Sequence, residues 1–205
     1  MLCAHFSILR HFAQESGSTQ EAEFRSVRVM PVLRPDLILA VLILVCAPAV
    51  PRGCAQGAVT IVALGASNTD GWGVDRSEAY PAQLQELLRA KGVNVTVRNA
   101  GIPGDTTGGM LARLGSWLAE GVRVVILQPG TNDERMGLGA ERAGNIEKIR
   151  AELAARGIGL IVVENSVLDE LPRGELRSDG VHFTPTGYAL LAQRILPDVL
   201  AALGK

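Results

Sequence analysis

The stretch A-V-T-I-V-A-L-G-A-S-N-T, residues 58–69, decides the fold class of this chain. Its first seven residues, Ala58–Leu64, form a short apolar run of the kind found in buried strands. The segment Gly65–Thr69 follows at once and predicts a turn where that strand ends. A strand without polar alternation must be covered on both faces, which indicates a parallel sheet between two layers of helices.

The same alternation of strand and helix continues through the rest of the chain. Three more segments are predicted as strands: Val93–Arg98, Val122–Gln128 and Ile158–Glu164. The spacing of apolar residues predicts helices over Glu78–Lys91, Thr107–Glu120, Ala140–Arg156 and a last segment that Thr184-Pro185 opens. We therefore predict an α/β fold, a three-layer flavodoxin-like sandwich around a parallel sheet of about four to five strands.

Three residues give finer expectations for where the helices begin and end. Ser77 can cap the first helix, and Gly92 can end it. Pro197 is expected to kink the last helix or to end it early, because proline lacks the N–H that a helix interior uses.

The first 57 residues differ in character from the remainder. Leu37–Val50 is a run of 14 apolar residues, whereas a membrane-spanning helix needs roughly 20. Because Ala55-Gln56-Gly57 supplies a small-x-small cleavage signal, we interpret residues 1–57 as a leader with a secretory signal peptide. Residues 1–29 are polar, so translation is expected to begin at Met30. An uncleaved anchor is the alternative.

This interpretation predicts an exported protein, periplasmic or secreted. Its folded domain would cover residues 58–205 and would keep no stable membrane span once the signal is cleaved.

Composition excludes several classes of function. The net charge is −1 and aromatic residues make up 4%, so neither a basic surface nor aromatic stacking indicates nucleic-acid binding.

The three cysteines all precede residue 58, and His182 is the only histidine after it. A cysteine nucleophile, a cysteine-based zinc site and a multi-histidine metal site are therefore excluded from the domain, and we expect no metal and no cofactor. Neither glycine-rich phosphate fingerprint occurs, which disfavours a nucleotide-binding domain.

Polar or glycine-rich segments follow the predicted strands: Gly65–Thr69, Asn99–Thr107, Pro129–Asp133 and, further on, Asp179–His182. Open parallel sheets bind ligands beyond the carboxyl ends of their strands. These segments would bring together a hydroxyl, backbone amides, a carboxamide, a carboxylate and an imidazole, which are the groups needed for acyl transfer.

Each of these residues also has a simpler structural interpretation. Ser67 suits a turn or a helix cap, and His182 suits an exposed surface. Gly104 suits a backbone position with positive φ, and Asn132 can bind its own loop. Only their joint placement at one edge of the sheet favours a catalytic site.

From about Val59 to its end the chain resembles the SGNH/GDSL hydrolases, a superfamily of esterases, thioesterases and lysophospholipases. The resemblance lies in four blocks that occur in the family's order: Gly65–Thr69, Asn99–Thr106, Gly130–Asp133 and Asp179–His182. It implies Ser67 as the nucleophile, His182 as the base and Asp179 as the residue that orients His182. It also implies three oxyanion donors: the Ser67 amide, the Gly104 amide and the Asn132 carboxamide.

One departure from the family pattern is Ala66, which stands where the family usually has an aspartate that braces the loop. The subgroup most similar to this chain consists of exported arylesterase-like or acyl-thioesterase-like enzymes. The resemblance predicts a serine hydrolase that cleaves short-chain esters or thioesters through an acyl-enzyme. A carbohydrate O-deacetylase and a non-catalytic ligand-binding module on the same fold are the alternatives.

The chain offers little material for a long acyl tunnel, because the segment between Asn132 and Asp179 is short and partly charged. The apolar residues available on the active-edge loops are Trp72, Ile102, Pro103, Met136, Leu138, Val167 and Leu168, of which Trp72, Ile102, Pro103 and Val167 are expected to bind substrate. We predict an open site for a small ester or thioester with an acyl chain of about two to six carbons, each buried methylene being worth about 0.8 kcal/mol. A lipid-chain enzyme whose mobile loops close over the substrate is the alternative.

Asp105 and Asp133 are expected to be structural residues that hold their loops in place.

Overall fold

The computed structural model describes residues 57–205 of the chain. The apolar run Leu37–Val50 and the expected start at Met30 lie outside these residues. Within them, four parallel strands form one sheet in the order β2-β1-β3-β4. The strands are β1 (Val59–Gly65), β2 (Val95–Gly101), β3 (Val122–Gln128) and β4 (Gly159–Val162).

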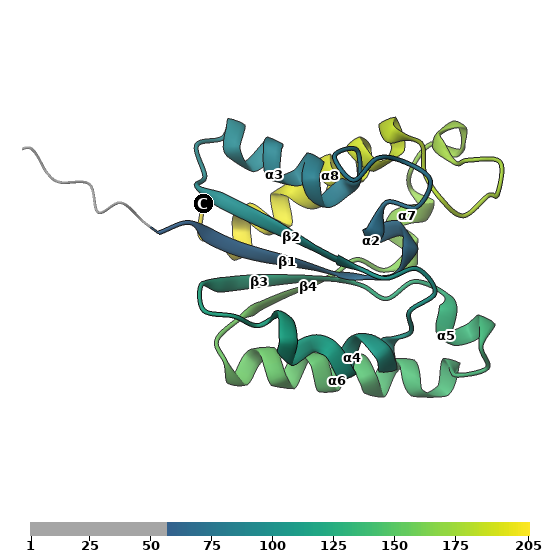
Figure 1. Ribbon diagram of the computed structural model, residues 1–205, viewed down its shortest axis with the longest axis horizontal. Coiled ribbons are helices and arrows are strands. Elements are labelled where there is room, and N and C mark those ends of the chain that lie inside the picture. The colour runs from purple at the N-terminus through teal and green to yellow at the C-terminus, as the bar shows by residue number, and fades with distance from the viewer. Residues whose placement is uncertain (1–56) are drawn as a thin grey trace, which may run out of the picture. The chain divides into compact units, whose positions relative to one another are not determined.

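Four long helices cover the two faces of this sheet, as Figure 1 shows. They are α3 (Tyr80–Ala90), α4 (Thr107–Trp117), α6 (Gly139–Ala155) and α8 (Pro185–Ala202). Alternate residues of β1 serve the two faces: Ile61 packs with α3 and α8, and Val62 packs with α4 and α6. The predicted α/β three-layer sandwich with a parallel sheet is therefore confirmed.

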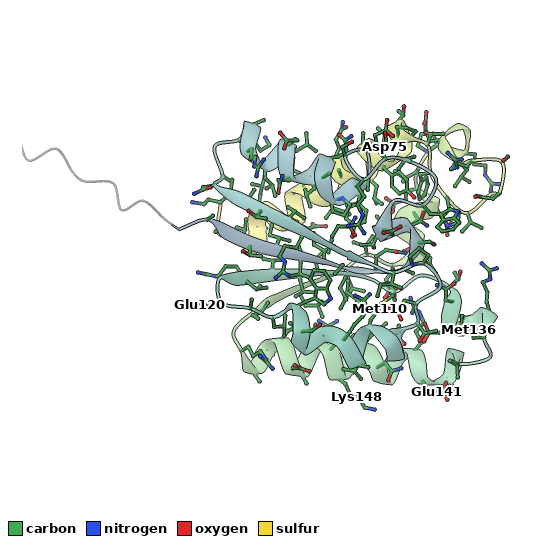
Figure 2. The ribbon with its side chains drawn as sticks, viewed as in Figure 1. Asp75, Met110, Glu120, Met136, Glu141 and Lys148 are labelled. Carbon is green, nitrogen blue, oxygen red and sulfur yellow. The ribbon has the colours of Figure 1, made fainter. Side chains whose placement is uncertain are left out.

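The side chains follow these layers. Met110 points from α4 toward the sheet and is fully buried, whereas Lys148 points from α6 away from it (Figure 2). The remaining short helices lie in the connections, and three of them follow the carboxyl ends of strands. They are α2 (Ser67–Asp70), α5 (Asn132–Arg135), α7 (Asn165–Asp169) and the 3-10 helix η2 (Arg173–Glu175).

Two expectations about helix ends need correction. Helix α3 begins at Tyr80 after Ala79, which makes no side-chain cap, so the predicted Ser77 cap is wrong. Pro81 lies in the first turn, where proline's missing N–H costs nothing. Pro197 does not end α8 early, since the helix continues through it to Ala202 and Val199 beyond the proline is fully buried in the core. Gly92 does follow the end of α3, with a positive φ of 78°.

The strand register brings the candidate segments to one edge of the sheet. Gly65 at the end of β1 is level with Gly101 of β2 and Gln128 of β3. Helix α2 packs directly onto these ends, and a Cβ atom at Gly101 would overlap the backbone of Asp70. Glycine at 101 therefore lets the turn that carries Ser67 lie against the sheet.

Candidate active site

Ser67, His182 and Asp179 form a continuous hydrogen-bonded chain. Ser67 is the first residue of α2, immediately beyond β1. Its Oγ atom lies 2.9 Å from Nε2 of His182, and Nδ1 of the same ring lies 2.9 Å from Oδ2 of Asp179. Residues 115 positions apart are thus joined at the carboxyl edge of the sheet.

The hydrogen bonds of Asp179 fix the protonation pattern of this chain. Its Oδ1 atom accepts from the backbone N–H groups of His182 and Val181, each at 2.9 Å. Donation by the His182 backbone, then by its ring, then by the Val181 backbone, holds the pKa of Asp179 well below its usual range. Since an ionised carboxylate only accepts, Nδ1 of His182 carries the proton and Nε2 is left to accept from Ser67.

A hairpin-like loop presents Asp179 and His182. Arg177 N–H donates to the His182 carbonyl at 2.7 Å, and Thr184 N–H donates to the Glu175 carbonyl at 2.8 Å. Gly180 takes a φ of 68° at the turn. This loop, residues 175–184, is named the base loop below.

Asn68 connects the base loop to the turn that carries Ser67. Its Nδ2 atom donates to the Val181 carbonyl at 3.2 Å, and its Oδ1 atom accepts from the Tyr188 hydroxyl at 3.2 Å. Burial raises the pKa of Tyr188 to about 12, so the hydroxyl stays protonated and remains a donor. Sequence analysis did not predict this connection, because Asn68 and Tyr188 are 120 residues apart.

Gly104 and Asn132 follow β2 and β3 on the same edge. Gly104 has a φ of 80°, the left-handed conformation that favours glycine. Asn132 begins α5, and its Nδ2 atom donates to the Asp105 carbonyl at 2.8 Å. The neighbouring Asp133 is fully buried and accepts from the Thr107 N–H at 3.0 Å and from its hydroxyl at 2.5 Å. Asp133 thus fastens α5 to the start of α4.

A cavity of about 1060 Å³ opens over these groups, and Ser67, Gly104, Asn132 and His182 all line it. Its apolar wall includes Trp72, Pro103, Met136, Leu168, Leu171 and Val181.

Two of the residues expected to bind substrate are not part of this lining. Ile102 faces solvent beside the cavity, with 47% of its surface exposed. Val167 packs against the core beneath α7. Met136, which follows α5 directly, does line the cavity and is labelled beside that helix in Figure 2. Leu171, Arg135 and Arg173 also line the cavity. Sequence analysis missed them because α5, η2 and the turn before η2 are too short to show a periodic pattern.

Within residues 57–205, no group of three histidine, cysteine, aspartate or glutamate side chains could hold a metal ion. Among the helices of the same residues, none has the length and apolarity needed to cross a membrane.

The model of the GDSL-like lipase/acylhydrolase family matches residues 63–177, more than half of the chain. The chain belongs to this family. Within this GDSL-like protein the matched region contains Ser67, Gly104 and Asn132 and ends just before Asp179 and His182. Esterase TesA of Pseudomonas aeruginosa is 33% identical over 108 residues, which are 52% of this chain and 54% of that protein. The chain spans about half the length of the curated relatives it matches.

Two solved structures share the fold of this GDSL-like protein over nearly their whole length. A crystal structure of TesA superposes with a TM-score of 0.64 at 24% identity, covering 70% of this chain and 99% of the other. AlinE4, an SGNH-hydrolase family esterase, superposes with a TM-score of 0.53 at 27% identity, covering 71% and 97%. The expected SGNH-hydrolase fold is thereby confirmed.

Proposed function

We propose that this chain is a serine-dependent ester hydrolase in which Ser67 is the nucleophile, His182 the general base and Asp179 the residue that orients His182. The proposal rests on one observation, the two 2.9 Å contacts that place the His182 ring between the Ser67 hydroxyl and the Asp179 carboxylate. A serine hydroxyl becomes an effective nucleophile only when an adjacent base removes its proton.

The first half of the reaction forms an acyl-enzyme. Ser67 Oγ attacks the carbonyl carbon of the ester while its proton passes to Nε2 of His182. The resulting imidazolium is stabilised by the ionised Asp179. It then gives the same proton to the departing alcohol or thiol as the tetrahedral intermediate collapses. In the second half a water molecule replaces the alcohol, with His182 again as base, and the acid is released.

The tetrahedral intermediate carries a negative oxygen that needs donors already in position. The Ser67 amide, the Gly104 amide and the Asn132 carboxamide are the proposed donors. Nδ2 of Asn132 has two hydrogens, and the Asp105 carbonyl takes one of them. The other is available to the cavity, which Asn132 lines.

We infer that the acyl chain is short, about two to six carbons, and that aryl or thiol leaving groups suit the site. Polar residues such as Thr131, Asn165 and Asp169 interrupt the apolar wall of the cavity, so a long chain would find no continuous apolar path. Trp72, half exposed, has its ring centre 6.1 Å from that of His182 and can contact an aryl leaving group. A p-nitrophenyl ester series from acetate to palmitate tests this inference. A kcat/KM that keeps rising beyond about eight carbons contradicts it, since each buried methylene would then add its ~0.8 kcal/mol.

Hydrolysis of p-nitrophenyl acetate by the purified protein tests the function itself. Turnover should be abolished in Ser67→Ala and retained in Ser166→Ala, a matched change at an exposed serine of α7. Equal turnover in the two variants would contradict the proposal. A protein that binds esters but turns none over would instead be a ligand-binding module.

We also propose that residues 1–57 direct export and are then removed. The apolar run Leu37–Val50 and the small residues at 55–57 support this step. Intact-mass measurement on protein from an exporting host should give a species that begins near residue 56–58. A mature species that still contains Leu37–Val50 would contradict it.

A further inference from the structure

Asp105, the residue after Gly104, is bound on three sides. Its carbonyl oxygen accepts from Asn132 Nδ2 at 2.8 Å. Its Oδ1 atom accepts from the Thr106 N–H at 2.9 Å, and its Oδ2 atom lies 2.8 Å from Nε of Arg113. The Asp105 backbone thus contacts Asn132, the proposed oxyanion donor of α5, while the Asp105 side chain binds Arg113 of α4.

Arg113 carries this connection on to the strand that precedes Ser67. Its Nη2 atom donates to the Gly65 carbonyl at 3.1 Å. The Arg113 and Asp105 side chains are only 17% and 11% exposed. The Asp105–Arg113 ion pair therefore adds a link between the ends of β1 and β2 and the start of α5. These are the three segments that carry Ser67, Gly104 and Asn132.

This pair is poorly arranged for stability alone. Buried ion pairs recover little more than the cost of removing their charges from water. Within residues 57–205, Nη1 of Arg113 is buried with no hydrogen-bond partner, which adds a further cost. The burial of Arg113 is therefore better explained by a role in positioning neighbouring groups than by a contribution to stability.

We propose that Asp105 and Arg113 are positioning residues that hold the oxyanion donors in register with Ser67. The inference rests on the proposed function. The Ala66 side chain has no hydrogen-bonding group, and its carbonyl already accepts from the Thr69 and Asp70 N–H groups within the turn. Arg113 fastens the turn instead, through the Gly65 carbonyl, while Asp105 fixes the plane of the Asn132 carboxamide. The rigid guanidinium presents its N–H donors to both acceptors at fixed positions, a geometry that the compact ammonium of lysine does not reproduce.

Gly109 provides a second, charge-neutral way to disturb the pair. A Cβ atom at this position would overlap Oδ1 of Asp105, so the carboxylate occupies the space that a side chain would fill. Gly115 lies in the same helix, and a Cβ atom there would meet nothing within 4 Å. Gly109→Ala and Gly115→Ala are therefore a matched pair, and both raise helix propensity.

The experiment measures kcat, KM and Tm with p-nitrophenyl acetate for Arg113→Lys, Gly109→Ala and Gly115→Ala, each alone and combined with Asn132→Ala. We expect Arg113→Lys and Gly109→Ala to lower kcat by about tenfold or more while KM changes less than about threefold, as for lost transition-state contacts. Gly115→Ala should leave kcat unchanged. In the Asn132→Ala background both effects should shrink at least about threefold, because the donor that the pair orients is already gone.

A loss of kcat that is undiminished in the Asn132→Ala background would overturn the proposal, as would an effect confined to KM or Tm. A kcat equal to that of the parent in both variants would overturn it as well. Failure of the proposed function is separate, since it would appear as full activity in Ser67→Ala.

Discussion

The two sides of the candidate site are held in different ways. On one side, Ser67, Gly104 and Asn132 follow three adjacent strands whose ends the sheet register aligns. Buried groups reinforce this side, among them the fully buried Asp133. On the other side, the base loop lies outside the sheet, and the Asp179 side chain is 43% exposed. Besides the Ser67–His182 bond, Asn68 to Val181 and Arg177 to Gly73 connect this loop to the turn after β1.

In the proposed mechanism, this difference separates the tasks of the two sides. Donors for a developing charge act best when they need no rearrangement, and a sheet edge supplies such rigidity. The base must only reach the hydroxyl, and local hydrogen bonds within the base loop suffice to aim it. Changes on the sheet side should therefore weaken the transition state, whereas changes at the connections of the base loop should disturb its alignment.

Removal of the proposed base should have the largest effect. His182→Ala is expected to lower kcat by about 10⁴-fold or more, because no other group accepts the Ser67 proton. Asp179→Asn should cost less, and the double variant should be no worse than His182→Ala alone, since the two residues act as a unit. Steady-state kinetics with p-nitrophenyl acetate measures this. Additive losses in the double variant would mean that the two residues act separately.

On the sheet side, Asn132→Ala should lower kcat by about 10²–10³-fold with little change in KM. The lost N–H would have bound the oxyanion and not the ground-state carbonyl. The same kinetic assay separates the two parameters. An increase in KM at constant kcat would make Asn132 a substrate-binding residue and would remove the distinction between the two sides.

Two buried tyrosines allow the same deletion on each side. Tyr188→Phe removes the hydroxyl that orients Asn68, so kcat should fall a few-fold and stability by about 1 kcal/mol. Tyr80→Phe removes a hydroxyl 3.4 Å from the hydroxyl of Thr69, whose other side-chain hydrogen bond within residues 57–205 is to Gln128 of β3 and not to the base loop. We expect it to lower stability without changing kcat. Denaturant unfolding and kinetics on both variants provide the check, and equal losses of kcat would contradict the account.

The smallest expected effect concerns pH. Hydrogen bonds from His182 and Val181 keep the pKa of Asp179 low, so it stays ionised well below the ~4 of a free aspartate. Its stabilising contribution is present above that value and is lost only as the pH falls through the lowered folded-state pKa. Asp179 should therefore contribute no protonation to the acid side of the kcat/KM profile, and the slope there should not exceed one. A steeper slope between about pH 4 and 5 would show that a carboxylate also titrates.

The sequence was sufficient to predict the part of the candidate site that follows the strands, because the end of a strand can be recognised from a short local segment. Three apolar runs and the β-rich segment Val93–Arg98 located the four strands, and Ser67, Gly104 and Asn132 follow three of them. The pairing of Asp179 with His182 was accessible from their three-residue spacing and the family resemblance.

Long-range side-chain contacts were beyond such reasoning. The Asn68–Tyr188 bond joins residues 120 positions apart, and Asp105–Arg113 links a loop to the second turn of a helix. Ile102 and Val167 were misplaced because an apolar residue on an active-edge loop can face the cavity, the core or solvent. Tertiary packing also decided the course of α8 past Pro197.

Labelling with a fluorophosphonate, which reacts preferentially with an activated serine, tests directly whether Ser67 is the nucleophile. Peptide mass spectrometry of the labelled protein should find one modified residue, Ser67, and labelling should inhibit ester hydrolysis in proportion. Labelling should be lost in His182→Ala and retained in Ser166→Ala, whose serine lies on α7 outside the hydrogen-bonded chain. A label on any other serine, or undiminished labelling of Ser67 in His182→Ala, would contradict the proposed chain from Asp179 through His182 to Ser67.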